Sequence, residues 1–119
     1  MQEIKLGIVE THFANIVWDT SPISSPELVK ICEKELGWKK STTYTVLKKL
    51  CDRGIFENKS GTVVTKIDRE EFYSIHSEKF VDQAFDGSLT SFIAAFTNRR
   101  KLSREEVAEI KKMIEHIGD

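Results

Sequence analysis

Short hydroxyl side chains and lysines gather in one stretch of the chain, which reads KKSTTYTVLKKL over residues 39–50. Threonine is a mediocre helix former, because its β-branched side chain loses rotamer freedom against the preceding turn. Its hydroxyl nevertheless donates and accepts hydrogen bonds, and the lysine ammonium group binds phosphate oxygens. The stretch is therefore a candidate binding surface for an anionic partner.

The formal net charge of −1 hides an uneven distribution of charge. Residues 39–59 carry six basic and two acidic side chains, whereas residues 68–119 carry eight basic and eleven acidic ones. A basic block inside a nearly neutral chain favours a local anionic partner over general stickiness. On charge alone, a solvated helix face explains this block equally well, so the elements around it must be considered.

Three helical patterns come first in the chain. Apolar side chains at helical spacing predict helices over residues 7–19, 26–36 and 41–53. A serine before a helix accepts hydrogen bonds from the first backbone amides, so we expect Ser25 to cap the second helix and Ser41 to cap the third.

A strand-rich segment follows the third helix, which is expected to end at Gly54. Residues 55–59 and 62–67 are rich in strand formers and flank the turn signal Ser60-Gly61, which predicts a two-stranded hairpin. Three helices followed by a two-stranded ribbon indicate a mainly α fold of the winged helix-turn-helix type. We assign this DNA-binding domain to residues 1–67.

Residues 68–119 contain three further short helical patterns, the last of which opens with a capping box formed by Ser103 and Glu106. Short helices cannot bury every apolar face alone, so packing against a second copy is the economical arrangement. We expect a C-terminal dimerisation region and a homodimer, with packing against the winged helix of the same chain as the alternative. The side chains expected at the dimer contact are Phe72, Phe80, Phe85, Phe92, Ile93, Phe96, Val107, Ile110 and Ile114.

In a helix-turn-helix, the second helix of the motif enters the major groove by its N-terminal turns. Thr42 and Thr45 are expected to face the DNA, while Thr43 falls on the inner stripe and is expected in the core. Tyr44 either contacts phosphate or sugar, or packs at the helix edge. The side chains expected to contact double-stranded DNA are Lys39, Lys40, Ser41, Thr42, Tyr44, Thr45, Lys48 and Lys49 on the third helix, and Asn58, Lys59, Ser60 and Thr62 at the hairpin tip.

Two other classes of function compete with DNA binding. The sequence has no P-loop, glycine-rich dinucleotide turn, HExxH motif or Cys-x-x-Cys spacing, so we expect no enzymatic activity and no cofactor. His12, His76 and His116 lack ligand spacing, which argues against a metal site. A winged helix used only for protein contacts is the second competitor, and the basic excess around the third helix argues against it.

The sequence also indicates a compartment. Cys32 and Cys51 fall on apolar helix faces and are expected to be reduced core thiols. The N-terminal segment MQEIKLGIVE lacks the apolar core of a signal peptide, and no apolar run approaches the roughly 18 residues of a membrane span. We therefore expect a cytoplasmic protein without membrane insertion.

The order of the motifs resembles one known family. IVWDTSPISSPELV precedes WKKSTTYTVLKKLCDRGIFE, a hairpin and an acidic helical tail, and this order is similar to that of the BlaI/MecI penicillinase-repressor family, to which the CopY repressors are related. The resemblance covers residues 7–117. It rests on Glu10, Ile16, Val17, Trp18, Trp38, Thr42, Thr45, Leu47, Leu50 and Gly54.

The resemblance implies a cytoplasmic homodimer whose winged helices bind a palindromic operator and whose C-terminal helices form the dimer contact. It also implies repression of genes for antibiotic resistance or cell-wall synthesis, relieved when a membrane sensor-protease leads to cleavage in the C-terminal part. Ala95-Phe96 occupies the place of the Asn-Phe pair cut in the best-known members, so the Phe is kept and the Asn is absent. Alternatively, Phe96 is simply a dimer-core residue. The Cys-x-Cys metal motif of CopY is absent, since no cysteine follows Cys51.

Overall fold

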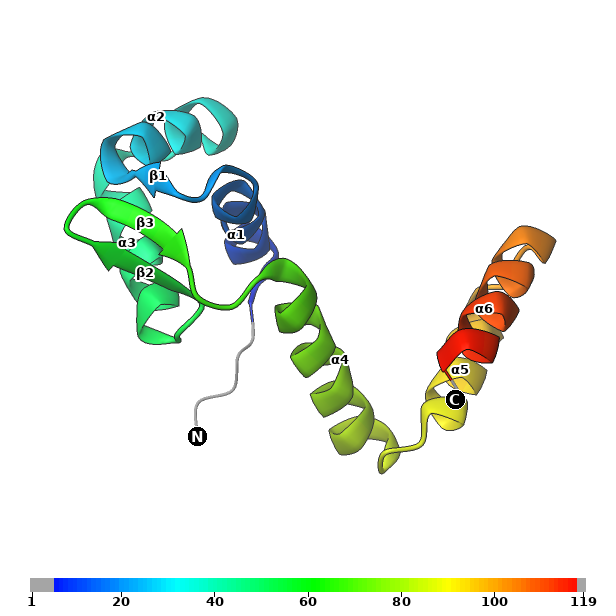
Figure 1. The fold of residues 1–119 in the computed structure, drawn as a ribbon. Helices are drawn as coiled ribbons and strands as arrows, with labels where there is room; N and C mark the ends of the chain where they lie inside the picture. The colour runs from blue at the N-terminus through cyan, green and yellow to red at the C-terminus, as the bar shows by residue number, and fades with distance from the viewer. Residues whose placement is uncertain (1–5, 118–119) are drawn as a thin grey trace. The chain divides into compact units, whose positions relative to one another are not determined.

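A computed structural model describes residues 6–117 of the chain (Figure 1). The elements in chain order are α1 (Ile8–Thr20), β1 (Ile23–Ser24), α2 (Ser25–Leu36), α3 (Lys40–Asp52), β2 (Phe56–Lys59), β3 (Thr62–Thr65), α4 (Arg69–Phe85), α5 (Leu89–Arg99) and α6 (Arg104–Ile117). The expected mainly α winged helix-turn-helix is confirmed, and the first three helices begin and end within one residue of the predicted bounds. Contacts divide the chain into a first unit that ends at Ser77 and a second that begins at Glu78.

The small sheet of the first unit has three antiparallel strands in the order β1-β3-β2. The hairpin of β2 and β3 agrees with the sequence pattern, but β1 was not predicted. Ile23 pairs with Val63, and Ser24 pairs with Thr62. A two-residue strand next to Pro22 gives no periodic signal, because its pairing depends on a partner far along the chain.

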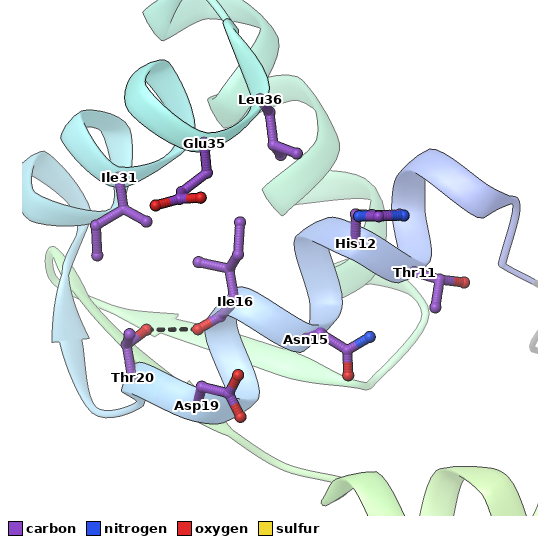
Figure 2. Close-up of a pocket in the computed structure, with 9 residues that line it drawn as sticks. All are labelled: Thr11, His12, Asn15, Ile16, Asp19, Thr20, Ile31, Glu35 and Leu36. Carbon is purple, nitrogen blue, oxygen red and sulfur yellow. Dashed lines mark hydrogen bonds between the residues drawn. The ribbon is translucent and has the colours of Figure 1, made fainter.

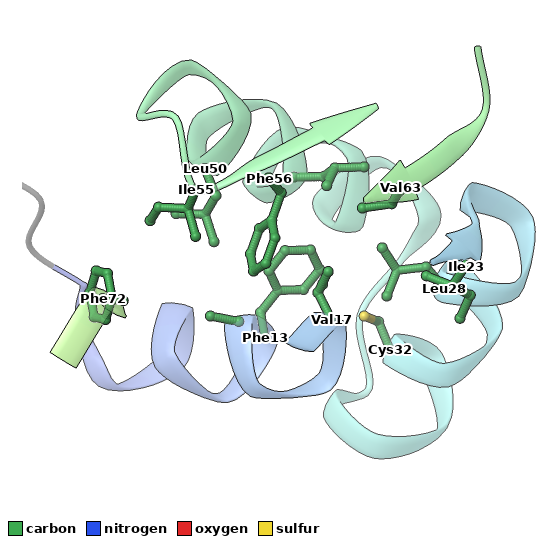
Figure 3. Close-up of a cluster of buried hydrophobic side chains, with 12 residues drawn as sticks. Phe13, Val17, Ile23, Leu28, Cys32, Leu50, Ile55, Phe56, Val63 and Phe72 are labelled. Carbon is green, nitrogen blue, oxygen red and sulfur yellow. The ribbon is translucent and has the colours of Figure 1, made fainter. Parts of the chain in front are cut away.

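The core of the first unit lies between the three helices and the sheet. Figure 3 shows Phe13 and Phe56 among the side chains of this core, and both are fully buried. Cys32 is buried there, as expected, whereas Cys51 packs at the edge of the core and is partly exposed. The buried apolar side chains are Phe13, Ala14, Val17, Ile23, Leu28, Cys32, Leu47, Leu50, Ile55, Phe56, Val63 and Phe72.

The N-caps predicted for α2 and α3 were wrong, by one residue and by two residues respectively. The side chain of Ser24, rather than Ser25, accepts a hydrogen bond from the Glu27 amide at the start of α2. Ser25 is instead buried, and its amide donates to the Gly61 carbonyl oxygen at 2.8 Å. At α3 the N-cap position is Lys39, without a side-chain cap, because the helix begins at Lys40, two residues earlier than a cap at Ser41 requires.

The predicted end of α3 at Gly54 is confirmed. The Gly54 amide donates to the Cys51 carbonyl oxygen, and the Ile55 amide donates to that of Leu50. This pair of bonds is the Schellman arrangement, in which the residue after the helix adopts positive φ. Gly54 has φ +82°, a conformation that favours glycine.

The first turns of α4 pack on α1 within the first unit. Arg69 donates to the Asn15 side chain at 3.0 Å and to Asp19 at 2.6 Å, and its guanidinium lies over the Trp18 ring. Phe72 lies beside Trp18, with 5.5 Å between ring centroids, and is only 4% exposed. The Phe72 side chain therefore belongs to the core of the first unit.

The second unit has well-capped helices but no buried core among its described residues. Ser88 accepts from the Ser91 amide, and the capping box of Ser103 and Glu106 is confirmed by reciprocal bonds of 3.0 Å. The hydrogen bond from the Ser103 amide lowers the pKa of the Glu106 carboxyl. The capping box therefore stabilises α6 at pH values above the usual pKa of a carboxyl group, and this stabilisation is lost as the pH falls through the lowered pKa. None of the described residues of α5 or α6 is buried.

No helix within residues 6–117 is both long enough and apolar enough to cross a membrane.

Replacing Phe72 by alanine is expected to destabilise the first unit. Removal of a buried phenylalanine ring typically costs about 3–5 kcal/mol of unfolding free energy. Urea denaturation followed by tryptophan fluorescence measures the loss, because Trp18 lies next to the cavity. Ser74→Ala, at an exposed position on the same helix, is the control and should leave the transition in place. Equal midpoints for the two variants would show that Phe72 is not a core residue.

Candidate nucleic-acid interface

The outer face of α3 carries a polar stripe. Thr43, Leu47 and Leu50 are buried, and the 100° spacing of helical residues puts Ser41, Thr45 and Lys48 on the opposite side. The exposed positions among the expected DNA contacts are Lys39, Lys40, Ser41, Thr42, Thr45, Lys48, Lys49, Asn58, Lys59, Ser60 and Thr62.

Thr45 is oriented by a bond within its own helix. Its hydroxyl donates to the Ser41 carbonyl oxygen at 2.9 Å. This bond uses the hydroxyl proton and leaves the oxygen lone pairs and the methyl group to face outward. Such a side chain can accept a hydrogen bond from a base amino group or contact a thymine methyl. The buried Thr43 makes the equivalent bond to the Lys39 carbonyl oxygen at 3.4 Å.

Tyr44 has a partner inside the first unit. Its hydroxyl donates to the buried Ser25 hydroxyl at 3.1 Å, and its ring packs against the core. The sequence left open whether Tyr44 contacts phosphate or sugar or packs at the helix edge. In the structure, its side chain packs at the helix edge. The phenol oxygen keeps acceptor capacity, but phosphate oxygens need donors.

The two adjacent lysines in the second half of α3, Lys48 and Lys49, have different surroundings. Lys49 Nζ lies 3.4 Å from Oε1 of Glu10 on α1, and Arg53 Nη1 lies 3.3 Å from Oε2 of the same carboxylate. Lys48 has no ion pair among the residues that the structure describes. Sequence reasoning missed the Glu10 contact, since 39 residues separate Glu10 from Lys49.

The hairpin tip is held close to the start of α2. Ser60 and Gly61 both have positive φ, +52° and +94°, which is the geometry of a two-residue turn between twisted strands. Asn58 contributes to this turn, because its side-chain oxygen accepts from the Gly61 amide at 2.9 Å. The Asn58 amide group and the side chains of Lys59 and Thr62 remain exposed.

A hollow of about 470 Å³ lies between α1 and α2, away from this polar stripe (Figure 2). Figure 2 shows Ile31 and Glu35 of α2 facing Ile16 and Thr20 of α1 across it. The Thr20 hydroxyl donates to the Ile16 carbonyl oxygen. Asn15 and Asp19 on its rim bind Arg69, so their polar groups serve the packing of α4 on α1.

The described side chains were considered as candidates for metal binding and thiol chemistry. No group of histidine, cysteine or carboxylate side chains within residues 6–117 is placed to hold a metal ion. Burial raises the pKa of the Cys32 thiol, although a hydrogen bond with Thr43 lowers it in part. Burial also raises the pKa of Cys51, so both thiols are weak nucleophiles near neutral pH.

Comparison with known proteins identifies the family. The model of the penicillinase repressor family matches residues 6–116. The chain belongs to the penicillinase repressor family. This membership supports the role of a transcriptional repressor, and it fits a protein that is not an enzyme.

Several relatives in the penicillinase repressor family match over most of their length. The penicillinase repressor of Bacillus licheniformis is 27% identical over 115 residues, which cover 93% of this chain and 90% of that protein. The penicillinase repressor of Staphylococcus aureus is 19% identical over 121 residues, covering 98% and 96%. The methicillin resistance regulatory protein MecI of Staphylococcus aureus is 18% identical over 114 residues, covering 92% and 93%.

Tyr44→Phe is expected to lower the unfolding free energy of this penicillinase repressor family member by about 0.5–1.5 kcal/mol, because Ser25 loses its donor. Chemical denaturation measures the change, and Tyr73→Phe, at an exposed position, is the matched control. If Tyr44→Phe had the same unfolding free energy as the wild type, the hydrogen bond from Tyr44 to Ser25 would not contribute to stability.

Proposed function

We propose that this chain represses transcription by binding a palindromic operator in double-stranded DNA as a homodimer. The observation that carries the proposal is the exposed stripe of Ser41, Thr45 and Lys48, opposite the buried face of α3. An α-helix about 10–12 Å in diameter fits a major groove about 12 Å wide. The hydroxyl groups of Ser41 and Thr45 then meet base edges along the floor of the groove, while the longer side chain of Lys48 reaches a phosphate group.

Phosphate contacts complete the proposed complex. Lys39 and Lys40 at the entry end of α3, and Lys59 at the hairpin tip, have exposed ammonium groups. The first amides of α3 add hydrogen-bond donors, because the Lys39 side chain does not cap them. These contacts position the protein on the duplex, while the hydroxyl groups of α3 supply sequence preference.

The second unit supports the dimer. Its aromatic cluster is formed by Phe80, Phe85 and Phe92, with ring centroids about 6 Å apart, and Phe96 lies next to it. An apolar hollow of about 230 Å³ opens beside the cluster. The large apolar side chains left exposed here are Phe80, Leu89, Ile93, Phe96, Val107, Ile110, Met113, Ile114 and Ile117.

So many exposed apolar side chains are unusual for a monomer, and a second copy is the partner that every molecule of the protein has available. We therefore propose that Phe80, Phe85, Phe92, Ile93, Phe96, Val107, Ile110 and Ile114 form the dimer contact. Phe72 is left out of this contact, because it is buried in the first unit.

Release from DNA by proteolysis is the switch that the family resemblance implies. Ala95 and Phe96 lie in the middle of α5, and both are exposed. Loss of the segment after this pair would remove the whole of α6 from the proposed dimer contact. We propose that the controlled genes serve antibiotic resistance or cell-wall synthesis and that a membrane sensor-protease acts in this pathway.

Thr45→Ala and Lys48→Gln should change DNA binding in different ways. Lys48→Gln is expected to weaken binding to all sequences and to lower the dependence of log K on log[salt] by about 0.9, the effect of one phosphate contact. Thr45→Ala is expected to relax operator choice by about 1–3 kcal/mol without changing that slope. Anisotropy titrations on operator and random duplexes across a salt series measure both quantities.

The same titrations test DNA binding itself. Wild-type binding that is absent at low salt, or that salt does not weaken, would favour the alternative of a winged helix used only for protein contacts. Equal losses for Thr45→Ala on both duplexes would remove Thr45 from the set of base contacts.

Replacing Ile110 and Ile114 by aspartate should produce monomers, because burying two carboxylates in an apolar contact is strongly unfavourable. Sedimentation equilibrium should give a mass near the 13.7 kDa of one chain, against twice that value for the wild type. Lys112→Asp lowers the net charge by the same two units from the opposite side of α6 and should remain dimeric. An unchanged mass for the double variant would refute this dimer surface.

A further inference from the structure

The carboxylate of Glu10 contacts two cations of α3 at once. Its Oε1 atom lies 3.4 Å from Lys49 Nζ, and its Oε2 atom lies 3.3 Å from Arg53 Nη1. The side chains of Glu10 and Arg53 are 21% and 23% exposed, whereas that of Lys49 is 50% exposed. Each carboxylate oxygen thus has its own cationic partner, and one of these partners, Lys49, is half exposed.

Lys48 and Lys49 make a natural comparison, because they are neighbours with the same charge. Adjacent residues of a helix point about 100° apart, so Lys48 continues the stripe of Ser41 and Thr45 while Lys49 flanks it on the side of α1. Lys49 is paired with Glu10, and Lys48 has no ion pair within residues 6–117.

The position of Lys49 is one from which a lysine can reach DNA. A helix that nearly fills the major groove has its flanks beside the phosphates of the groove walls. An unpaired ammonium group on this flank would neutralise a phosphate and release counterions. The Glu10 carboxylate competes with phosphate for Lys49, and because an exposed ion pair contributes little free energy, the effect on affinity is expected to be small.

This inference rests on the proposed DNA binding. We propose that Glu10 is a positioning residue that limits the sequence-independent part of DNA affinity by keeping Lys49 from the phosphates. Lysine–phosphate contacts strengthen binding to every duplex, whichever bases it contains. Glu10 thereby sets how many of the α3 lysines contribute to binding, and Lys48 contributes while Lys49 does not.

Glu10→Gln keeps the size of the side chain and removes its charge. This variant should bind a random-sequence duplex roughly twofold to fivefold more tightly at low salt, the gain from freeing Lys49 from its exposed ion pair. Its dependence of log K on log[salt] should steepen by about 0.9, the value for one added phosphate contact. Lys49→Gln should leave the slope of the wild type unchanged but should cancel the gain in the Glu10→Gln background.

The control is Glu71→Gln, which removes the same charge from the first turn of another helix. It should leave both affinity and slope unchanged. A gain in Glu71→Gln equal to that in Glu10→Gln, or an unchanged slope in Glu10→Gln, would overturn the inference.

Lys49→Gln in the wild-type background gives a test that needs no Glu10 variant to fold. A fall of the slope by about 0.9 there would show that Lys49 contacts phosphate despite Glu10, and would overturn the inference on its own. The proposed function has a separate signature: if the wild type does not bind duplex DNA at low salt, DNA binding itself fails. If the wild type binds duplex DNA and salt weakens this binding, but a variant shows one of the contradicting slopes above, only the role of Glu10 is refuted.

Discussion

The inner face of α3 packs into the hydrophobic core, and this packing sets the direction of every other side chain on the helix. Thr43, Leu47 and Leu50 are buried against Phe13, Phe56 and their neighbours. Because helical residues are spaced by 100°, burial of one face turns the hydroxyl and lysine stripe towards solvent. The presentation of the polar stripe therefore depends on apolar contacts on the far side of the helix.

The two units of the chain differ in how far they bury their apolar side chains. The first unit has its own core, to which α4 contributes Phe72. The second unit has capped helices and an aromatic cluster, yet its large apolar side chains stay exposed. In the proposed dimer, folding of the second unit and association of the two chains are thermodynamically linked. Dilution should therefore reduce both the dimer fraction and the stability of the second unit.

Local patterns predicted what depends on neighbouring residues. Apolar side chains at helical spacing predicted the helices. Hydrogen bonds confirm the predicted helix end at Gly54 and the predicted capping box of Ser103 and Glu106. Features that depend on distant residues could not be predicted. The strand β1 needs β3, and Glu10 meets Lys49 across 39 residues of sequence. The caps of α2 and α3 were misplaced because several adjacent serines, threonines and lysines offer equivalent local signals.

In the proposed complex, the outer face of α3 and the hairpin tip bind DNA. Titration of the isotope-labelled chain with a short duplex, followed by amide chemical shifts, locates the contact most directly. We expect the largest changes at Ser41, Thr45 and Lys48 and at the turn around Ser60, with little change in α5 and α6. Changes concentrated on the hollow between α1 and α2, or on the second unit, would rule out this mode of binding.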